Sequence, residues 1–364
     1  MTAARRHHRL TGEFPMHRGD VLLEPTIAYE TWGSLNAAAS NAVLIFTGLS
    51  PSAHAASCDA DPTPGWWEGI VGPGLAIDTQ RYFVICVNSL GSCFGSTGPA
   101  SIDPRSGRRY GLRFPLLSLE DVARGGFEVL QHLGVQRLHT LVGPSMGGMS
   151  ALAFELLFPG LSERLLLIST CAHSLPFAVA LRSLQREMIR RDPAWRGGEY
   201  PADAVPVQGM RLARKLGMLT YRSAEEMQQR FGRRRVPSDR IDDDPFGISF
   251  EIESYLEHHA NRFTGEFDPN CFLYLSRASD LFDVAEHADG VSNALGRIRA
   301  RESMVIGVSS DFLFPIAQQK ELASGLSGHG REARFVEIAS LQGHDSFLVD
   351  MPGFQPVIGE FFAA

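Results

Sequence analysis

The sequence predicts an α/β fold, in which a mostly parallel central sheet is covered by helices on both faces. Three observations predict it: short apolar runs recur along the chain, loops rich in glycine, serine or proline follow them, and helical stretches often come next. Alternating strand and helix patterns are typical of parallel sheets, because each crossover lays a helix on a face of the sheet.

Six apolar runs carry the strand pattern, four in the first half of the chain and two near its end. The helical stretch at 118–133 opens with Ser118 as N-cap and has Asp121 three residues later, which predicts a capping box. Helices are also expected at 315–326 and 354–362. The expected strands are 42–46, 82–87, 138–142, 165–169, 303–308 and 333–338.

The middle of the chain differs from both halves. Between residues 175 and 295 the strand pattern fades, and the sequence becomes helical and rich in arginine, methionine and phenylalanine. We therefore expect residues 175–295 to form a helical lid inserted between strands of one sheet. Residues 15–174 and 296–364 would form the α/β core, and residues 1–14 a loose N-terminal tail. A chain of 364 residues, 44% of them hydrophobic, suits one large domain with such an insertion.

The composition argues against several classes of function. The net charge of −7 gives no electrostatic reason to expect a nucleic acid or an anionic membrane as partner. No apolar run resembles a secretory signal or approaches the about 18 residues of a membrane span, so we expect a cytoplasmic protein. The five cysteines include no C-x-x-C pair and no zinc-site spacing, so we expect reduced thiols and no metal site.

A Gly-x-Ser-x-Gly pattern marks the candidate nucleophile, Ser145. The apolar run at 138–142 leads into Gly143, Pro144, Ser145, Met146 and Gly147, and a helical stretch follows. The pattern alone is weak, because an ordinary strand–turn–helix connection can contain it by chance. In this context it predicts a nucleophile elbow, in which the flanking glycines permit a tight turn and the serine stands at a helix N-terminus. The fold class is then the α/β-hydrolase fold.

The base and the acid are expected late in this fold, in the order serine, acid, histidine. His344 follows the last expected strand beside a glycine, and Asp311 follows the strand before it. In this interpretation His344 takes the proton of Ser145, and Asp311 fixes the imidazole tautomer. The competing acids are Asp345 and Asp350, and the competing histidines, which lie too early in the chain, are His54, His173, His258 and His259.

Two backbone N–H groups are expected to hold the oxyanion. One belongs to Met146, directly after the nucleophile. The other should come from the loop after the first core strand, and our choice there is Leu49.

Seven motifs occur in a fixed order along the chain. They are Tyr29-Glu30-Thr31-Trp32-Gly33, Gly65-Trp66-Trp67, Val71-Gly72-Pro73-Gly74, Gly95-Ser96-Thr97-Gly98-Pro99, Ser145-Met146-Gly147-Gly148-Met149, Asp311-Phe312-Leu313-Phe314-Pro315 and Gly343-His344-Asp345. Together they make the chain resemble a known family, the homoserine O-acyltransferases of the α/β-hydrolase fold, from about residue 15 to the C-terminus. The resemblance implies transfer of an acyl group from acyl-CoA, as co-substrate and without another cofactor, to the side-chain hydroxyl of an amino acid. It also implies a ping-pong route through acyl-Ser145.

The resemblance also assigns roles to individual residues. Ser145, Asp311 and His344 match the catalytic triad of the family. Arg214 matches the arginine that binds the carboxylate of the acceptor, and Asp345 matches the acid that receives its amino group. The chemistry agrees, because a free amino acid needs one fixed cation and one fixed anion.

Two departures from the acetyl-transferring members bear on specificity. The substrate-selecting loop reads Gly48, Leu49, Ser50 and Pro51, and Arg182 stands where acetyl-specific members tend to have an uncharged residue. A cation there would pair with the distal carboxylate of a succinyl group, and Pro51 would narrow the pocket against homoserine. These features are similar to the branch that makes O-succinylserine, a precursor of cysteine, with succinyl-CoA and L-serine as substrates.

Three alternatives stay open. The acceptor could be L-homoserine with a succinyl or acetyl donor, in methionine biosynthesis. The same triad would also serve a serine esterase or thioesterase, because the fold does not separate transfer from hydrolysis. The third alternative is a binding protein without catalysis, against which the complete triad argues. The apolar helical face of the lid further predicts a homodimer.

Overall fold

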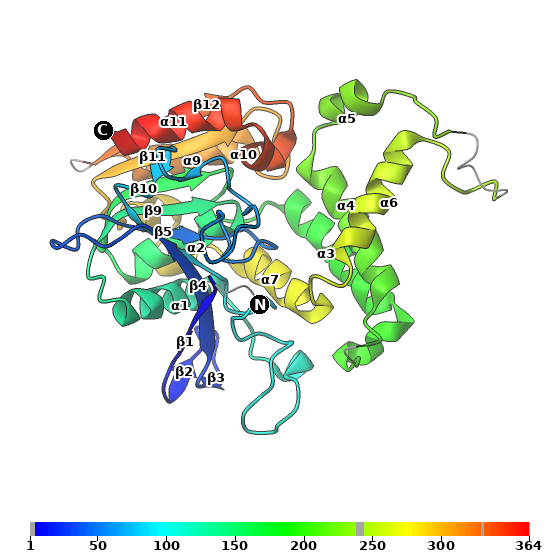
Figure 1. Ribbon diagram of the computed structural model, residues 1–364, viewed down its shortest axis with the longest axis horizontal. Coiled ribbons are helices and arrows are strands. Elements are labelled where there is room, and N and C mark those ends of the chain that lie inside the picture. The colour runs from blue at the N-terminus through cyan, green and yellow to red at the C-terminus, as the bar shows by residue number, and fades with distance from the viewer. Residues whose placement is uncertain (1–3, 202, 238–243, 329–330, 364) are drawn as a thin grey trace.

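The computed structural model describes residues 4–201, 203–237, 244–328 and 331–363, and it has an eight-stranded central sheet (Figure 1). Six neighbouring strands are parallel, while β4 and β1 continue the sheet antiparallel at one edge. In order across the sheet the strands are β1 (Arg6–Arg9), β4 (Thr26–Trp32), β8 (Phe83–Val87), β5 (Ala42–Phe46), β9 (Leu138–Pro144), β10 (Ser162–Ile168), β11 (Glu302–Val308) and β12 (Glu332–Ile338).

The predicted fold class and its six strands are confirmed. The central strands are apolar on both faces because both faces are covered, as in parallel sheets generally. In β5, Leu44 and Phe46 enter one core cluster while Val43 and Ile45 enter the other. The first cluster includes residues of α1 (Leu119–His132), α2 (Met146–Leu157) and α9 (Ile316–Leu326), and the second includes residues of α11 (Met351–Ala363).

Helix α1 begins where the sequence predicts. The Ser118 hydroxyl accepts a hydrogen bond from the Asp121 N–H, and the Asp121 carboxylate accepts one from the Ser118 N–H. Two N–H groups that lack an intrahelical partner are thereby satisfied. The five cysteines are free, as expected. No helix in the described ranges is long and apolar enough to span a membrane.

The N-terminal segment differs from the expected loose tail. Within residues 1–14, β1 pairs antiparallel with β4, in a register that sets Arg6 opposite Tyr29. The tail prediction is therefore wrong for Arg6–Arg9. An edge strand can be polar because much of it faces solvent, so Arg-His-His-Arg carries no apolar signal of a strand. Two further short strands, β2 (Glu13–Pro15) and β3 (Val21–Leu23), form a separate antiparallel pair.

The helical segment between β10 and β11 forms a layer beside the sheet. Figure 1 shows α3 to α6 standing next to the core, with α7 leading back to it. Helix α3 packs on α4 and on α7, and α4 packs on α6. Side chains of α3 and α4 line a pocket together with Ser145, so these helices lie beside the carboxyl end of β9. Their bounds are α3 (Pro176–Arg191), α4 (Val207–Tyr221), α5 (Ala224–Phe231), α6 (Glu251–Phe263), α7 (Pro269–Leu281) and α8 (Val291–Leu295).

Candidate active site

Ser145 occupies a strained turn between β9 and α2. Its φ and ψ angles are 55° and −127°, a conformation that residues with a side chain rarely adopt. A Cβ on Gly147 would lie 2.2 Å from the carbonyl oxygen of Phe46, and a Cβ on Gly143 would lie 2.3 Å from that of Gly147. The Thr170 hydroxyl donates a 2.7 Å hydrogen bond to the Ser145 carbonyl. Only glycine therefore fits on either side of this serine.

His344 and Asp311 meet Ser145 in a continuous chain of hydrogen bonds. Ser145 Oγ lies 2.8 Å from His344 Nε2, and His344 Nδ1 lies 2.8 Å from Asp311 Oδ2. The other carboxylate oxygen, Oδ1, accepts 2.9 Å hydrogen bonds from the N–H groups of Leu313 and Phe314. His344 and Asp311 are each only 3% exposed. The arrangement can pass a proton from the serine hydroxyl to an oriented imidazole.

The two N–H groups expected to form an oxyanion hole lie beside the serine. Met146 is the first residue of α2, so its N–H has no acceptor within the helix. Leu49 lies in the loop after β5, and its side chain lines the same cavity as Ser145. Neither N–H donates a hydrogen bond to a group in the part of the chain that the structure describes.

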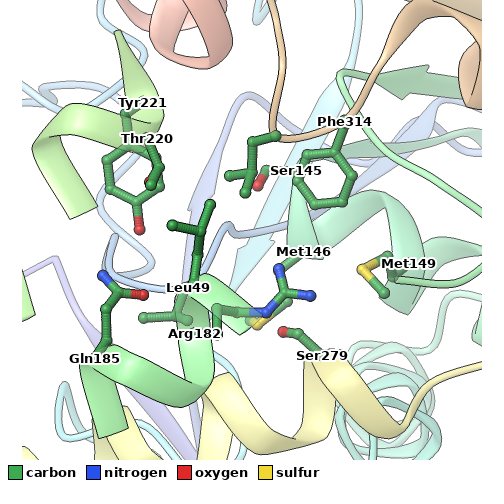
Figure 2. A pocket seen from close by; sticks show the side chains of 12 residues that line it. Leu49, Ser145, Met146, Met149, Arg182, Gln185, Thr220, Tyr221, Ser279 and Phe314 are labelled. Carbon is green, nitrogen blue, oxygen red and sulfur yellow. The ribbon is translucent and has the colours of Figure 1, made fainter. Parts of the chain in front are cut away.

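Two cavities meet at Ser145. The first contains Arg182 and is called the Arg182 pocket; Figure 2 shows its lining. The second contains Arg214 and is called the Arg214 pocket. Both are lined by Leu49, Ser145 and Tyr221. A group bound to Ser145 Oγ could therefore be approached from either pocket.

The Arg214 pocket combines a cation and an anion beside the triad. The Arg214 guanidinium lies 4.5 Å from the ring centre of Phe263 and makes no ion pair with a described carboxylate. Its Nε is buried without a hydrogen-bond partner among the described residues. Asp345 lines the same pocket with His344 and lies 3.5 Å from Arg222 Nε. Burial raises the pKa of Asp345, while Arg222, His344 and Arg214 act in the opposite direction.

The predicted loop forms one wall of the Arg214 pocket. Gly48, Leu49, Ser50 and Pro51 all line it, together with Arg214 and Asp345. Trp66 lines it too, and its indole N–H donates a 3.0 Å hydrogen bond to the Ser52 carbonyl, which ties the loop to the segment that follows.

The Arg182 pocket contains one cation whose position is fixed by neighbours. Arg182 Nε donates a 2.6 Å hydrogen bond to Asp280 Oδ1, and Nη2 donates one to Ser174 Oγ. Figure 2 shows the guanidinium near the side chains of Met146 and Ser279, among the residues that line the cavity with Ser145. The structure thus places Arg182 and Ser145 in the lining of one pocket.

Sequence reasoning did not identify several residues of the site. Asp280 and Arg222 pair with predicted residues, but nothing in their local sequence separates them from ordinary helical charges. Tyr221 divides the two pockets, and it too lies in an unremarkable helical stretch. The competing histidines and Asp350 make no hydrogen bond with Ser145. No group of three His, Cys, Asp or Glu side chains that could hold a metal occurs among the described residues.

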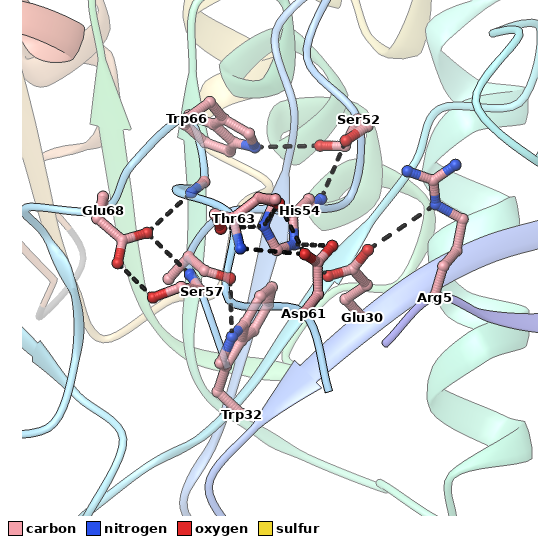
Figure 3. Close-up of polar contacts among 12 residues, drawn as sticks. Arg5, Glu30, Trp32, Ser52, His54, Ser57, Asp61, Thr63, Trp66 and Glu68 are labelled. Atoms are coloured by element: carbon pink, nitrogen blue, oxygen red, sulfur yellow. Dashed lines mark hydrogen bonds and ion pairs between the residues drawn. The ribbon is translucent and has the colours of Figure 1, made fainter. Parts of the chain in front are cut away.

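A buried polar cluster holds the loop behind the Arg214 pocket (Figure 3). His54 Nδ1 lies 2.7 Å from the Glu30 carboxylate on β4, and Nε2 lies 2.8 Å from the Thr63 carbonyl. Both neighbours are acceptors, so the arrangement favours the imidazolium form, which donates from both ring nitrogens. Burial alone would lower the pKa of His54, but the bonds to Thr63 and Glu30 and the charge of Asp61 outweigh it and raise the pKa.

The chain matches the family model described as alpha/beta hydrolase fold over residues 41–351. It is 57% identical over 360 residues to a serine O-succinyltransferase from Stenotrophomonas maltophilia, covering 99% of this chain and 97% of that one. It is 56% identical over 363 residues to a serine O-succinyltransferase from Frateuria aurantia, covering 99% of each.

Solved structures show the same fold. A homoserine O-acetyltransferase from Bacillus anthracis aligns with a TM-score of 0.90 at 29% identity, covering 99% of this chain and 97% of that one. The esterase E22 aligns with a TM-score of 0.88 at 28% identity, covering 98% and 99%. The architecture is thus shared by enzymes that are named for acyl transfer and for ester hydrolysis.

We predict that Gly147→Ala destabilises the protein. The Cβ of the new alanine would clash with the backbone of Phe46, which cannot rotate away. The free energy of unfolding should therefore fall by about 1–3 kcal/mol or more. Gly359→Ala is the control, because its Cβ would make ordinary contacts at 3.9 Å. Denaturant unfolding of both variants checks this, and equal stability of the two would contradict it.

We predict that His54 stabilises the fold in a pH-dependent way. Its pKa in the folded protein lies above the ordinary 6.5. The stabilisation is therefore complete below about pH 6.5 and is lost as the pH rises through the raised value. The melting temperatures of wild type and His54→Gln should differ most below that pH and converge above it. The exposed His258→Gln is the control, and a gap that stays constant or widens with pH would disprove the role.

Proposed function

Since the chain belongs to the α/β-hydrolase fold family and, within it, to the serine O-succinyltransferases, we propose that it transfers a succinyl group from succinyl-CoA to the hydroxyl of L-serine. One observation carries the proposal. Ser145, which is hydrogen-bonded to His344, lines both the Arg182 pocket and the Arg214 pocket. The first pocket contains one fixed cation, and the second contains the cation of Arg214 and the anion of Asp345. The first suits a carboxylate-bearing acyl group and the second suits a free amino acid.

The first half-reaction acylates the enzyme. His344 Nε2 takes the proton of Ser145 Oγ, and the oxygen attacks the thioester carbonyl carbon. The N–H groups of Leu49 and Met146 receive the oxyanion that forms. The carbon–sulfur bond then breaks, His344 returns its proton to the leaving thiolate, and the succinyl group stays on Ser145. Asp311 stabilises the imidazolium between the two proton transfers.

The donor is selected in the Arg182 pocket. The distal carboxylate of a succinyl group would pair with the Arg182 guanidinium, a charge-assisted interaction that an acetyl group lacks. This difference supports succinyl-CoA over acetyl-CoA as the donor.

The second half-reaction delivers the acyl group to the acceptor. Arg214 would bind the α-carboxylate of serine, and Asp345 its ammonium group. The hydroxyl of L-serine gives its proton to His344 and attacks the acyl carbon. The bond between that carbon and Ser145 Oγ then breaks, and His344 returns the proton to Ser145 Oγ. Pro51 in the loop that lines the pocket favours L-serine over L-homoserine, although one methylene gives only about 1–3 kcal/mol of discrimination.

Hydrolysis is the second candidate activity, because the esterase E22 has the same fold. A triad alone would serve either reaction. Arg214 and Asp345 favour transfer, since a water molecule needs neither of them. Side chains of the lid helices α3 and α4 also line the cavity that contains Ser145, and they would limit the access of water to an acyl-enzyme.

We also infer a cytoplasmic homodimer that acts in cysteine biosynthesis. Large apolar side chains are exposed on α3 and α4, at Leu184, Leu212 and Leu219. Exposed apolar side chains on neighbouring helices are typical of contact surfaces between subunits.

A substrate matrix tests the proposed function. Succinyl-CoA and acetyl-CoA are each combined with L-serine and L-homoserine, and the release of CoA is followed. We expect succinyl-CoA with L-serine to be fastest, and Ser145→Ala to lose all pairs. Equal CoA release with and without an acceptor would favour hydrolysis, and faster reaction with acetyl-CoA would refute the succinyl donor.

Arg214→Gln and Asp345→Asn should separate the two half-reactions. Both variants should raise the KM for L-serine, by about tenfold or more, because each removes a charge-assisted contact to the acceptor alone. The burst of CoA released from succinyl-CoA without acceptor should stay near the wild-type level. Rapid-quench measurements check this, and an equal loss in both half-reactions would contradict the assignment.

A further inference from the structure

We propose that Asp280 is a specificity-determining residue that acts through Arg182, by positioning the guanidinium that receives the distal carboxylate of the acyl group. The proposal rests on the proposed function, because it concerns the succinyl end of the donor. Asp280 itself lies on α7 and is not among the residues that line the Arg182 pocket. It is therefore a positioning residue and not a catalytic one.

The contacts of Arg182 leave one nitrogen for a ligand. Nε is fixed by Asp280 at 2.6 Å, and Nη2 is fixed by Ser174, whose hydroxyl in turn donates to the Ser279 carbonyl. Nη1 makes no hydrogen bond within the described ranges, and Arg182 lines the pocket that contains Ser145. Because a guanidinium is planar, two fixed nitrogens determine where the third one points.

The same carboxylate also sets the charge of the site. Asp280 is 1% exposed, and its second oxygen lies 2.6 Å from Arg186 Nη2, one helical turn beyond Arg182 on α3. The guanidinium of the buried Arg182 and that of the partly buried Arg186 thus share one carboxylate, which leaves one positive charge uncompensated. Burial lowers the pKa of Arg186, and the positive charges of Arg277 and Arg182 add to this effect against that of Asp280. The site is therefore suited to one further negative charge.

A ligand with one free carboxylate supplies that charge. The acyl group of succinyl-CoA ends in one carboxylate, whereas an acetyl group ends in a methyl group. Binding of the former neutralises the Arg182 pocket, and binding of the latter leaves a buried charge unpaired, which is costly in a site of low polarity. The chemical class selected is thus a dicarboxylic acyl group with one free end.

The primary test is Asp280→Asn. We expect kcat/KM for succinyl-CoA to fall by about tenfold or more, mainly through KM, because the guanidinium loses its charged partner. The burst of p-nitrophenolate from p-nitrophenyl acetate, a neutral acyl donor, should change less than about twofold, since it needs Ser145 but not Arg182. An equal loss with both donors would show that Asp280 is only structural and would overturn the proposal.

A second variant covers the case in which Asp280→Asn does not fold. Ser174→Ala removes only the contact to Nη2 of Arg182 and keeps the ion pair with Asp280. It should shift the donor preference in the same direction but less, and no shift would count against the proposal. Asp280→Glu keeps the carboxylate and should restore part of the succinyl preference. Glu187→Gln is the matched control. It also removes a carboxylate, but one that is exposed and pairs with Arg191 on α3, the helix that carries Arg182.

A competition experiment separates the two proposals. Free succinate should slow the p-nitrophenyl acetate burst in wild type, and much less in Asp280→Asn. If wild type does not react with succinyl-CoA but this difference is present, the proposed function fails and the role of Asp280 stands. If wild type reacts with succinyl-CoA while succinate competes equally in both proteins, the role of Asp280 is wrong and the proposed function stands.

Discussion

The close approach of α2 to β5 is the constraint on which the rest of the site depends. Gly147 lies against the backbone of Phe46, so the chain must turn sharply at Ser145 and hold it at a positive φ angle. The turn lifts the hydroxyl to the carboxyl end of β9, where the loops after β11 and β12 bring Asp311 and His344. A strained residue persists here because buried packing on both sides leaves the backbone no alternative.

The two arginines whose pockets meet at this serine differ in the partners that hold them. Arg182 is held by Asp280 and Ser174, and Arg214 lies against aromatic rings without an ion pair to a described carboxylate. A fixed guanidinium recognises one geometry of carboxylate, while an unpaired one depends on its ligand for compensation of charge. Under the proposed function, the difference would suit an acyl group that stays through both half-reactions and an amino acid that enters only for the second.

The sequence contains the strands and the triad in a form that can be recognised locally. The strands β5 and β9 are apolar on both faces, which an alternating half-exposed strand is not. His344 follows the last strand of the chain, β12, beside Gly343. Arg6–Arg9 could not be recognised, because pairing with β4 is a long-range property and the segment is polar. Asp280 could not be recognised either, since its role depends on which face of α7 meets α3, and that is decided by tertiary packing.

The strand β1 has a consequence for the behaviour of the protein in solution. Without it, β4 would present a row of unpaired backbone groups at the end of the sheet, which is a template for association with other chains. The Arg-His-His-Arg strand pairs with these backbone groups and presents basic side chains at the edge of the sheet. We therefore expect removal of the first nine residues to cause aggregation and poor solubility before any loss of turnover.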